Sequence, residues 1–270
     1  MNPPAPTAVR AETAGAQTLR RGLAVLRLLA RSTTGGLRMS DIGRRLGLPK
    51  ATAVRLTLTL VEEGFLTQDV ATRLYRLGPE AFAVGLAAEP AYALQRRAAP
   101  ALRTLALETG DWVFFSVLQG LEVICLSRES GNIPYPASAL KVGDRHPLGV
   151  GAGGAAMLAQ LPDDEVTRAL EVNAEAIARD YPRKTPTVIR ELVQETRQKG
   201  YCVVAGTLVR GYSGLGVALI DARQRPVAAI VLVSTTARLN PTRSAALGQR
   251  MQQLASELMA RGSDGETRGD

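Results

Sequence analysis

The stretch from Arg38 to Tyr75 constrains the fold more than any other part of the chain. A helix is predicted to start at Ser40, whose short polar side chain suits an N-cap position, and to stop at Gly47–Pro49. The proline of that turn fits the first turn of a second helix, predicted from about Lys50 to Glu63 and closed by Gly64. Two short helices joined in this way form a helix-turn-helix, whose second helix can enter a DNA major groove.

The second predicted helix has an apolar side and a polar start. Its inward stripe is predicted to consist of Val54, Leu58 and Val61. At its exposed start, Lys50, Thr52 and Arg55 offer donors suited to phosphates and base edges. Two apolar runs then flank a polar tip from Gln68 to Arg73, which predicts a β-hairpin. We interpret this hairpin as the wing of a winged helix-turn-helix.

A further helix is predicted ahead of this motif, over residues 18–32. Its apolar face is predicted to consist of Leu19, Leu23, Leu26 and Leu29 or Ala30. Residues 1–16 are rich in Pro, Ala and Thr and lack periodicity, so we expect a disordered tail there. Residues 17–78 are then predicted to form one DNA-binding domain.

The positive charge of the chain is concentrated on this region. The whole chain carries a net charge of +8, and between Arg10 and Arg76 there are 12 Arg and Lys against 5 Asp and Glu, an excess of seven. The remainder holds 21 basic and 20 acidic residues, an excess of one. A local basic excess suits a polyanionic partner, because neutralised phosphates release counterions. A solvated basic face in an arginine-rich protein is the alternative explanation, and the helix-turn-helix pattern favours the first.

Composition excludes several classes of protein. The chain has 270 residues, enough for two domains, and no run of 18 uncharged apolar residues. The N-terminal residues contain no apolar segment typical of a secretory signal. Cys125 and Cys202 lie far apart in apolar runs, which argues against a disulfide framework or a zinc site. We therefore predict a cytoplasmic protein without a membrane segment.

In the second half of the chain, the spacing of apolar residues changes from a helical period to the alternation typical of strands. Residues 79–99 are predicted to form a helical linker, kinked or divided at Pro90, and a new helix is predicted to open at Pro100. Strand-like runs occupy residues 112–118, 121–126, 201–205, 214–221 and 226–235, with helices predicted at residues 155–161, 163–175, 186–199 and 241–261. Hairpins separated by helices favour an α+β domain with a mixed or antiparallel sheet over residues 100–261. A polar tail is predicted at residues 262–270.

The segment Gly149–Gly154 satisfies the pattern G-x-G-x-x-G of dinucleotide-binding proteins. That fingerprint requires a buried strand directly before it and an acidic residue after the next strand, and neither is present. Two explanations remain open. The backbone N–H groups at a helix start can bind a small anion such as a carboxylate. Alternatively, the glycines permit close packing or a sharp turn.

Candidate catalytic groups are few. His146 is the only histidine and lies in a Pro-flanked polar loop, where a surface position is expected. Ser213 lacks the spacing of a nucleophile elbow, and the two cysteines are predicted core residues. The acidic run at residues 163–165 favours a helix N-terminus rather than a metal site. Trp112, Phe114 and Phe115 are core or pocket residues, with Phe115 on the opposite strand face from the other two. No cofactor, metal or catalytic residue is predicted.

The motifs, in their order and spacing, resemble the IclR family of transcriptional regulators. The first domain carries LRRGLAVLRLLA, MSDIGRRLGLPKATAVRLTLTLVEEGFL and RLYRLGPEAFAVG. The second carries LALETGDWVFFSVLQGLEVICLSRESG, KVGDRHPLGVGAGGAAMLAQLP, IRELVQETRQKGYCV and PVAAIVLVS. The resemblance spans about residues 18–261. The form HPLGVGAGG is similar to a branch associated with the catabolism of aromatic or other organic acids.

This resemblance implies a winged helix-turn-helix, a linker helix and a GAF-like effector-binding domain, in a homodimer or dimer of dimers on a double-stranded DNA operator. It implies DNA contacts from Ser40, Arg44, Lys50, Ala51, Thr52, Arg55, Arg73 and Tyr75. Ala51 departs from the family, which often has Ser there, so one hydroxyl contact is expected to be missing.

The resemblance also implies an effector site. Its predicted residues are Phe115, Leu140, Leu148, Gly151, Ala152, Gly153, Gly154, Val204, Gly214, Val231 and Val233. Members that bind small keto acids often have an acidic residue at the position of Val204, Cys at that of Gly214 and Ser at those of Val231 and Val233. These departures favour a partly apolar carboxylate, aromatic or aliphatic, over glyoxylate or pyruvate. Ligand binding is expected to act on the DNA-binding domains through the linker helices.

Two other functions fit parts of the chain. An enzyme that processes a small anion at Gly149–Gly154 would require a catalytic base, which the sequence does not offer. A nonspecific architectural DNA-binding protein would leave the second domain, of about 160 residues, unexplained.

Overall fold

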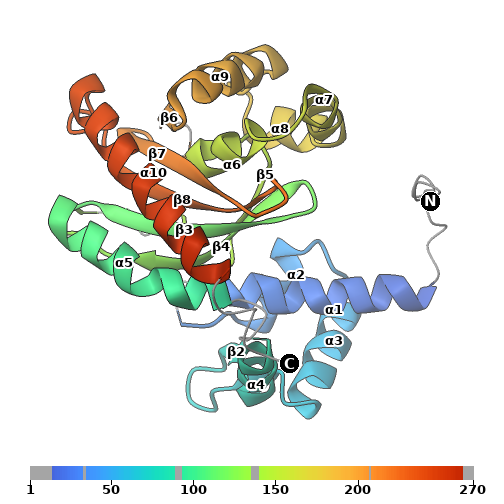
Figure 1. Ribbon diagram of the computed structural model, residues 1–270. Coiled ribbons are helices and arrows are strands. Elements are labelled where there is room, and N and C mark those ends of the chain that lie inside the picture. Colours follow the sequence, from blue (N-terminus) through green and yellow to red (C-terminus); the bar gives the residue numbers. More distant parts are fainter. Residues whose placement is uncertain (1–13, 33–34, 89–92, 135–139, 207, 264–270) are drawn as a thin grey trace, which may run out of the picture. The chain divides into compact units, whose positions relative to one another are not determined.

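The computed structural model describes residues 14–32, 35–88, 93–134, 140–206 and 208–263 (Figure 1). It divides into two compact units, Met1–Ala91 and Tyr92–Asp270. This boundary falls inside the predicted helical linker at residues 79–99. One helix of that stretch belongs to the first unit and the other to the second. Residues 1–13 of the tail predicted at 1–16, and residues 264–270 of the tail predicted at 262–270, lie outside the described residues.

The first unit is a small helical domain with a two-stranded hairpin. Its elements are α1 (Ala14–Ala30), α2 (Met39–Arg45), α3 (Lys50–Glu62), β1 (Leu66–Gln68), β2 (Tyr75–Leu77) and α4 (Pro79–Ala87). The strands β1 and β2 pair antiparallel, and Leu37 adds a bridge to Tyr75. The core gathers Val25, Leu29, Leu37, Ile42, Leu66 and Tyr75. This architecture confirms the predicted helix-turn-helix and wing.

Several details of the first unit differ from the predictions. The helix α2 starts at Met39 with Arg38 at its N-cap, so Ser40 is the second helical residue and not the cap. The helix α1 starts at Ala14, inside the predicted tail.

The predicted apolar faces of α1 and α3 are only partly correct, because Leu26, Leu29 and Val61 pack on the core of the unit and other predicted residues do not. In α1, Leu19 is 65% exposed, and Val25 and Leu29 are the buried residues. The helix is rich in leucine, so more than one stripe satisfies the helical period. In α3, the buried residues are Ala53, Leu56 and Thr57, whereas Leu58 is exposed. A stripe containing alanine and threonine escapes a search for large apolar residues.

The second unit is built on a six-stranded antiparallel sheet, as the α+β prediction requires. The strands are β3 (Trp112–Gln119), β4 (Glu122–Glu129), β5 (Arg145–Pro147), β6 (Cys202–Ala205), β7 (Tyr212–Ile220) and β8 (Pro226–Thr235), in the spatial order β5-β4-β3-β8-β7-β6. The short edge strand β5 was expected to be a loop. A three-residue strand carries too little alternation to be detected.

Helices cover both faces of this sheet (Figure 1). One face packs against α5 (Ala93–Thr109) and α10 (Pro241–Ser263). The other packs against α6 (Gly151–Leu158), with α7 (Asp163–Val172), α8 (Ala174–Asp180) and α9 (Pro186–Lys199) beyond it. The helix α5 runs through Pro100, which was expected to open a helix, and α6 starts four residues earlier than predicted. The helix α9 has the predicted bounds, with Thr185 as its N-cap and Gly200 ending it at a φ of 76°.

The helix α6 lies unusually close to the sheet. A Cβ atom on Gly153 would stand 2.6 Å from Val231 Cγ2, and one on Gly216 would stand 2.4 Å from the carbonyl carbon of Ala152. At the other end of α6, the guanidinium of Arg197 donates to the carbonyl oxygens of Ala159 at 3.0 Å and Leu161 at 2.7 Å. Glycines on both surfaces and an arginine at the C-terminal end therefore fix the position of α6.

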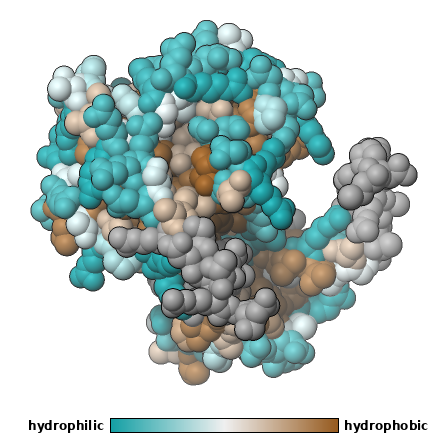
Figure 2. Space-filling model, viewed as in Figure 1, coloured by the Kyte–Doolittle hydropathy of each residue, from teal (hydrophilic) through white to brown (hydrophobic). Residues whose placement is uncertain are grey.

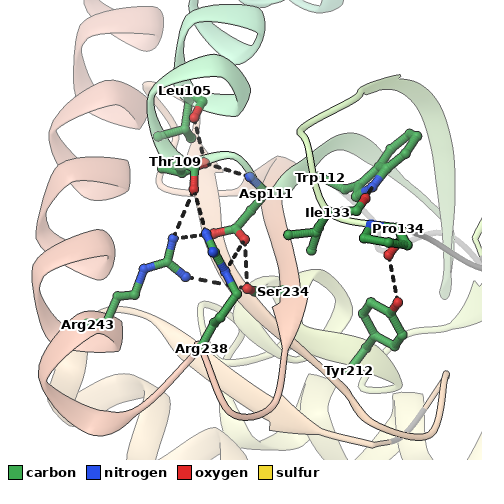
Figure 3. Close-up of polar contacts among 10 residues, drawn as sticks. All are labelled: Leu105, Thr109, Asp111, Trp112, Ile133, Pro134, Tyr212, Ser234, Arg238 and Arg243. Atoms are coloured by element: carbon green, nitrogen blue, oxygen red, sulfur yellow. Dashed lines mark hydrogen bonds and ion pairs between the residues drawn. The ribbon is translucent and has the colours of Figure 1, made fainter.

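A buried ion pair joins four elements at one corner of this unit (Figure 3). Asp111 is completely buried and accepts from Arg243 at 2.5 Å and from the hydroxyl of Ser234 at 2.7 Å. Arg238 lies 3.4 Å from the same carboxylate and donates to the carbonyl oxygen of Thr109 at 2.9 Å. The contacts connect the end of α5, the start of β3, β8 and the start of α10.

Candidate functional site

The first unit carries a basic groove of about 740 Å³ between α2, α3 and the wing. Its lining includes four cationic side chains and no carboxylate among the described residues: Arg38, Arg44, Lys50 and Arg73. Arg44 also pairs with Asp41 at 2.6 Å, but Arg44 is largely exposed and such a pair is weak. The groove therefore presents donors suited to the phosphates of a nucleic-acid backbone.

The predicted DNA-binding residues separate into three groups. Ser40, Arg44, Lys50 and Arg73 line the groove. Ala51 and Arg55 are exposed on α3 outside the groove lining, and Thr52 beside them is half-buried. Tyr75 also borders the groove, but only 5% of it is exposed and it packs in the core of the unit. Tyr75 therefore has a packing role, and its contact with DNA stays a prediction.

Sequence reasoning missed three polar residues of this groove: Arg38, Gln68 and Thr72. Thr72 also shapes the wing tip, since its backbone N–H and hydroxyl both donate to the Asp69 carboxylate at 2.8 Å. The backbone donation from Thr72 is the main cause that lowers the pKa of Asp69 below its usual value. Arg73, next in the chain, has a φ of 60°, a left-handed conformation that the turn imposes.

The second unit contains a narrow cavity in two lobes under α6. The first lobe, of about 50 Å³, is lined by Val204, Gly214, Val231, Val233, Tyr212, Ser213 and Val209. The second, of about 30 Å³, is lined by Ser116, Val123, Cys125, His146, Val150, Gly153 and Gly154. Five residues border both lobes or the space between them: Leu140, Gly151, Ala152, Leu208 and Val231. We call the first lobe the valine lobe and the second the histidine lobe.

Most predicted effector residues meet at this cavity, but two do not. Phe115 belongs to the opposite face of the sheet and packs against α5 and α10, while Phe114 lies on the face that α6 covers. Leu148 is fully buried in the core and does not border either lobe. The alternation along β3 was predicted correctly, but alternation does not say which face carries the cavity.

The glycine-rich segment has a packing role that the structure makes explicit. Gly149 and Gly151 adopt φ values of 96° and 73°, which other residues rarely reach, and Gly153 allows contact with the sheet. All residues of α6 are buried, and its N-cap residue Val150 makes no side-chain capping hydrogen bond. The glycines thus allow α6 to pack closely on the sheet. They also leave the backbone N–H groups at the start of α6 as donors at the cavity.

His146 was expected to lie on the surface. The structure places it half-buried in β5, beside the histidine lobe. Its Nδ1 is 2.7 Å from the hydroxyl of Tyr181, which follows α8. On the neighbouring strand, burial raises the pKa of the Cys125 thiol to about 12, and burial has the same effect on Cys202. Both thiols are therefore neutral core groups, as predicted, and not nucleophiles.

Comparisons with known proteins agree with this architecture. Residues 18–70 match the sequence model of the IclR helix-turn-helix domain, and residues 90–260 match that of the C-terminal domain of bacterial IclR transcriptional regulators. The chain belongs to the IclR family of transcriptional regulators.

Individual relatives are similar over nearly their whole length. The transcriptional repressor IclR of Escherichia coli K12 is 27% identical over 248 residues, which cover 91% of this chain and 90% of that protein. The crystal structure of a regulator from Alicyclobacillus acidocaldarius aligns with a TM-score of 0.74 at 24% identity, covering 90% of this chain and 98% of that one. An IclR homolog from Microbacterium hydrocarbonoxydans, crystallised with 4-hydroxybenzoate, gives 0.71 at 22%, with the same coverage.

This IclR-family protein is thus a DNA-binding transcriptional regulator with a C-terminal domain for a small-molecule effector. Its relatives are named as repressors, and nothing in the comparisons supports the enzyme alternative. None of its described helices is long and apolar enough to span a membrane. No described group of three or more His, Cys, Asp and Glu side chains could hold a metal ion.

Proposed function

We propose that the effector of this regulator is an aromatic or otherwise partly apolar carboxylate. The observation that carries the proposal is the pairing of a valine-lined lobe with the backbone donors at the start of α6. Among its described residues, the lining of the valine lobe offers no charged side chain to a compact keto acid. Its valines, Val204, Val231 and Val233, suit the apolar body of a larger acid. The 4-hydroxybenzoate bound by the Microbacterium homolog is a ligand of this class.

The cavity has to expand before it can hold such a molecule. Lobes of about 50 and 30 Å³ hold only a few waters, whereas pockets for drug-sized ligands measure roughly 300–1,000 Å³. A ligand that binds only the expanded state shifts the protein toward it, by as much as it distinguishes the two states. We propose that this shift reaches the DNA-binding unit through α5, the first helix of the effector unit.

We further propose that the groove lined by Arg38, Arg44, Lys50 and Arg73 follows the DNA backbone while Arg55 reads base edges. In this arrangement Ser40, Ala51 and Thr52 lie against the duplex. The exposed position of Arg55 on α3 supports the base contact, because a recognition helix needs a free donor outside its phosphate anchors.

A homodimer, or a dimer of such dimers, is the assembly that we propose. Exposed apolar side chains on two helices of the first unit support it: Leu19 and Leu23 on α1, and Phe82, Val84 and Leu86 on α4. Figure 2 shows apolar atoms exposed on this unit. Twofold symmetry would present two recognition helices to paired half-sites of an operator.

The effector class can be tested with the purified full-length protein. Trp112 is the single tryptophan, and its indole N–H donates to the carbonyl oxygen of Ile133 at 2.9 Å, so its fluorescence reports on the effector unit. Benzoate and 4-hydroxybenzoate are expected to change this fluorescence and to raise the melting temperature, whereas glyoxylate and pyruvate are not. Stabilisation by pyruvate and by no aromatic acid would contradict the proposal.

The same acids belong in a gel-shift assay on the DNA upstream of the protein's own gene, with nonspecific competitor and a salt series. We expect a specific complex whose affinity changes when an aromatic acid is added. A complex that responds to no acid, or that shows no sequence preference, would contradict the proposed regulation.

A further inference from the structure

The two lobes of the effector cavity differ in chemistry. The valine lobe is bordered by Val204 and Val233, whereas Gly153 and Gly154 border only the histidine lobe. A carboxylate held by the backbone of Gly151–Gly154 therefore lies toward the histidine lobe, with the apolar body of the ligand in the valine lobe. This orientation rests on the effector class proposed above.

The lining of the histidine lobe contains a single group that can carry a positive charge. Among the described residues that border it, there is no Lys, Arg, Asp or Glu. Cys125 is the other titratable side chain there, and its thiol stays neutral because burial raises its pKa to about 12. Among the described residues of this lining, His146 is therefore the side chain whose positive charge can pair with an anionic ligand.

The imidazole is held from outside the cavity. Tyr181 lies beyond the lobe, with its hydroxyl 2.7 Å from His146 Nδ1 and the two rings edge-to-face at 6.0 Å. When the hydroxyl of Tyr181 donates to Nδ1, the neutral ring carries its proton on Nε2. An N–H in that position is a donor, and it becomes a charged donor when the ring is protonated.

We propose that His146 recognises the carboxylate of the effector and so sets the selectivity of this regulator for acids over neutral analogues. Tyr181 is the positioning residue that fixes the orientation of the imidazole. The apolar body of the ligand is recognised separately, by the valine lobe.

The test compares benzoate with benzamide, which has nearly the same shape but no charge. Affinities are measured by Trp112 fluorescence or calorimetry on the full-length protein and on H146L, H146Q and Y181F. The wild type is expected to prefer benzoate. In H146L the affinity for benzoate should fall about tenfold or more, the value of a charge-assisted hydrogen bond, while the affinity for benzamide changes little.

The other variants separate recognition from damage to the fold. H146Q keeps a neutral donor and should retain part of the preference, and it serves if H146L does not fold. Y181F should reduce the preference by less than H146L does. V233A, in the valine lobe, should weaken both ligands by the same factor.

An unchanged benzoate-to-benzamide ratio in H146L and H146Q would overturn the role of His146 and leave the proposed effector class intact. Equal losses of both ligands in these variants would overturn it as well, since they indicate structural damage alone. If neither benzoate nor 4-hydroxybenzoate binds the wild type, the effector class itself fails, and the role of His146 fails with it.

Discussion

Gly153 and Gly216 show at the scale of single residues how closely α6 packs on the sheet. A side chain at either position would collide with the opposite surface of the α6–sheet contact. The obstacle differs, since Gly153 meets the side chain of Val231 and Gly216 meets the backbone of Ala152. This difference leads to distinct outcomes on substitution.

We expect G153A to lower the free energy of unfolding by about 1–3 kcal/mol, because the added methyl group overpacks the contact with Val231. The double variant G153A/V231A should recover much of this loss. G216A should destabilise the protein at least as much as G153A, and V231A should not rescue it. Urea denaturation followed by circular dichroism measures all four, and rescue of G216A by V231A would refute the packing explanation.

Arg55 and Lys50 lie five residues apart on α3, and we expect them to contribute differently to DNA binding. R55A should lower the affinity for the specific operator by roughly 1–3 kcal/mol and relax the preference at one base position. K50A should weaken all sequences alike and reduce the salt dependence by about one ion. Gel shifts on specific and scrambled DNA distinguish the two. An equal effect of R55A on both DNAs would make Arg55 a phosphate contact.

Individual residues also mark how far the sequence could predict the site. The glycines and valines of the cavity follow from family positions, and the structure brings them together. Phe115 and Leu148 were misplaced, because neither periodicity nor position tells which face of a strand or loop borders a cavity. His146 was missed for a related reason: a Pro-flanked polar segment favours a loop, but pairing with β4 makes it an edge strand beside the cavity.

At the scale of elements, secondary structure followed from the sequence wherever local signals were strong. The hairpin of β3 and β4, the capped helix α9 and the strands β7 and β8 were predicted because alternation, an N-cap and turn residues agree there. The faces of α1 and α3 were predicted only in part, because tertiary packing selects one of several apolar stripes. Pro100 lies inside α5 since packing of that helix on the sheet outweighs the cost of one proline.

The corner around Asp111 yields a prediction about how elements are joined. Arg243 makes the shortest contact with the buried carboxylate, and its loss leaves an incompletely paired charge in the interior. R243A should therefore destabilise the effector unit by roughly 3 kcal/mol. R238A should cost about 1 kcal/mol or less, because Arg238 is partly exposed and Arg243 remains. Thermal unfolding checks the order, and equal losses would contradict it.

At the scale of the whole molecule, the positive excess is concentrated in residues 10–76 of the DNA-binding unit, whereas the effector unit holds 21 basic against 18 acidic residues, an excess of three. The division and the charge asymmetry could both be predicted from the sequence. The predicted break at Pro90 lies next to the boundary between the units, but the sequence did not assign the two helices of the linker to different units. The structure assigns α4 to the first unit and α5 to the second.

The exposed apolar residues of α4 predict the behaviour of the assembled protein. Phe82 is 69% exposed, so F82S should cost the isolated chain little stability. If α4 contributes to a dimer interface, F82S should shift the protein toward the monomer in analytical ultracentrifugation and weaken operator binding. V172S alters another exposed apolar residue, on α7 of the effector unit, and serves as the control. A dimer unaffected by F82S would place the interface elsewhere.

The close contact between α6 and the sheet also determines how such a regulator could be turned into a biosensor for a new compound. Gly153 and Gly216 belong to the scaffold, since any side chain there displaces α6. Val204 and Val233 border the cavity without touching those glycines, so a mutant library can vary them freely. Val231 faces both the cavity and Gly153, and its replacement by a larger residue requires compensation. Directed evolution should therefore begin at Val204 and Val233.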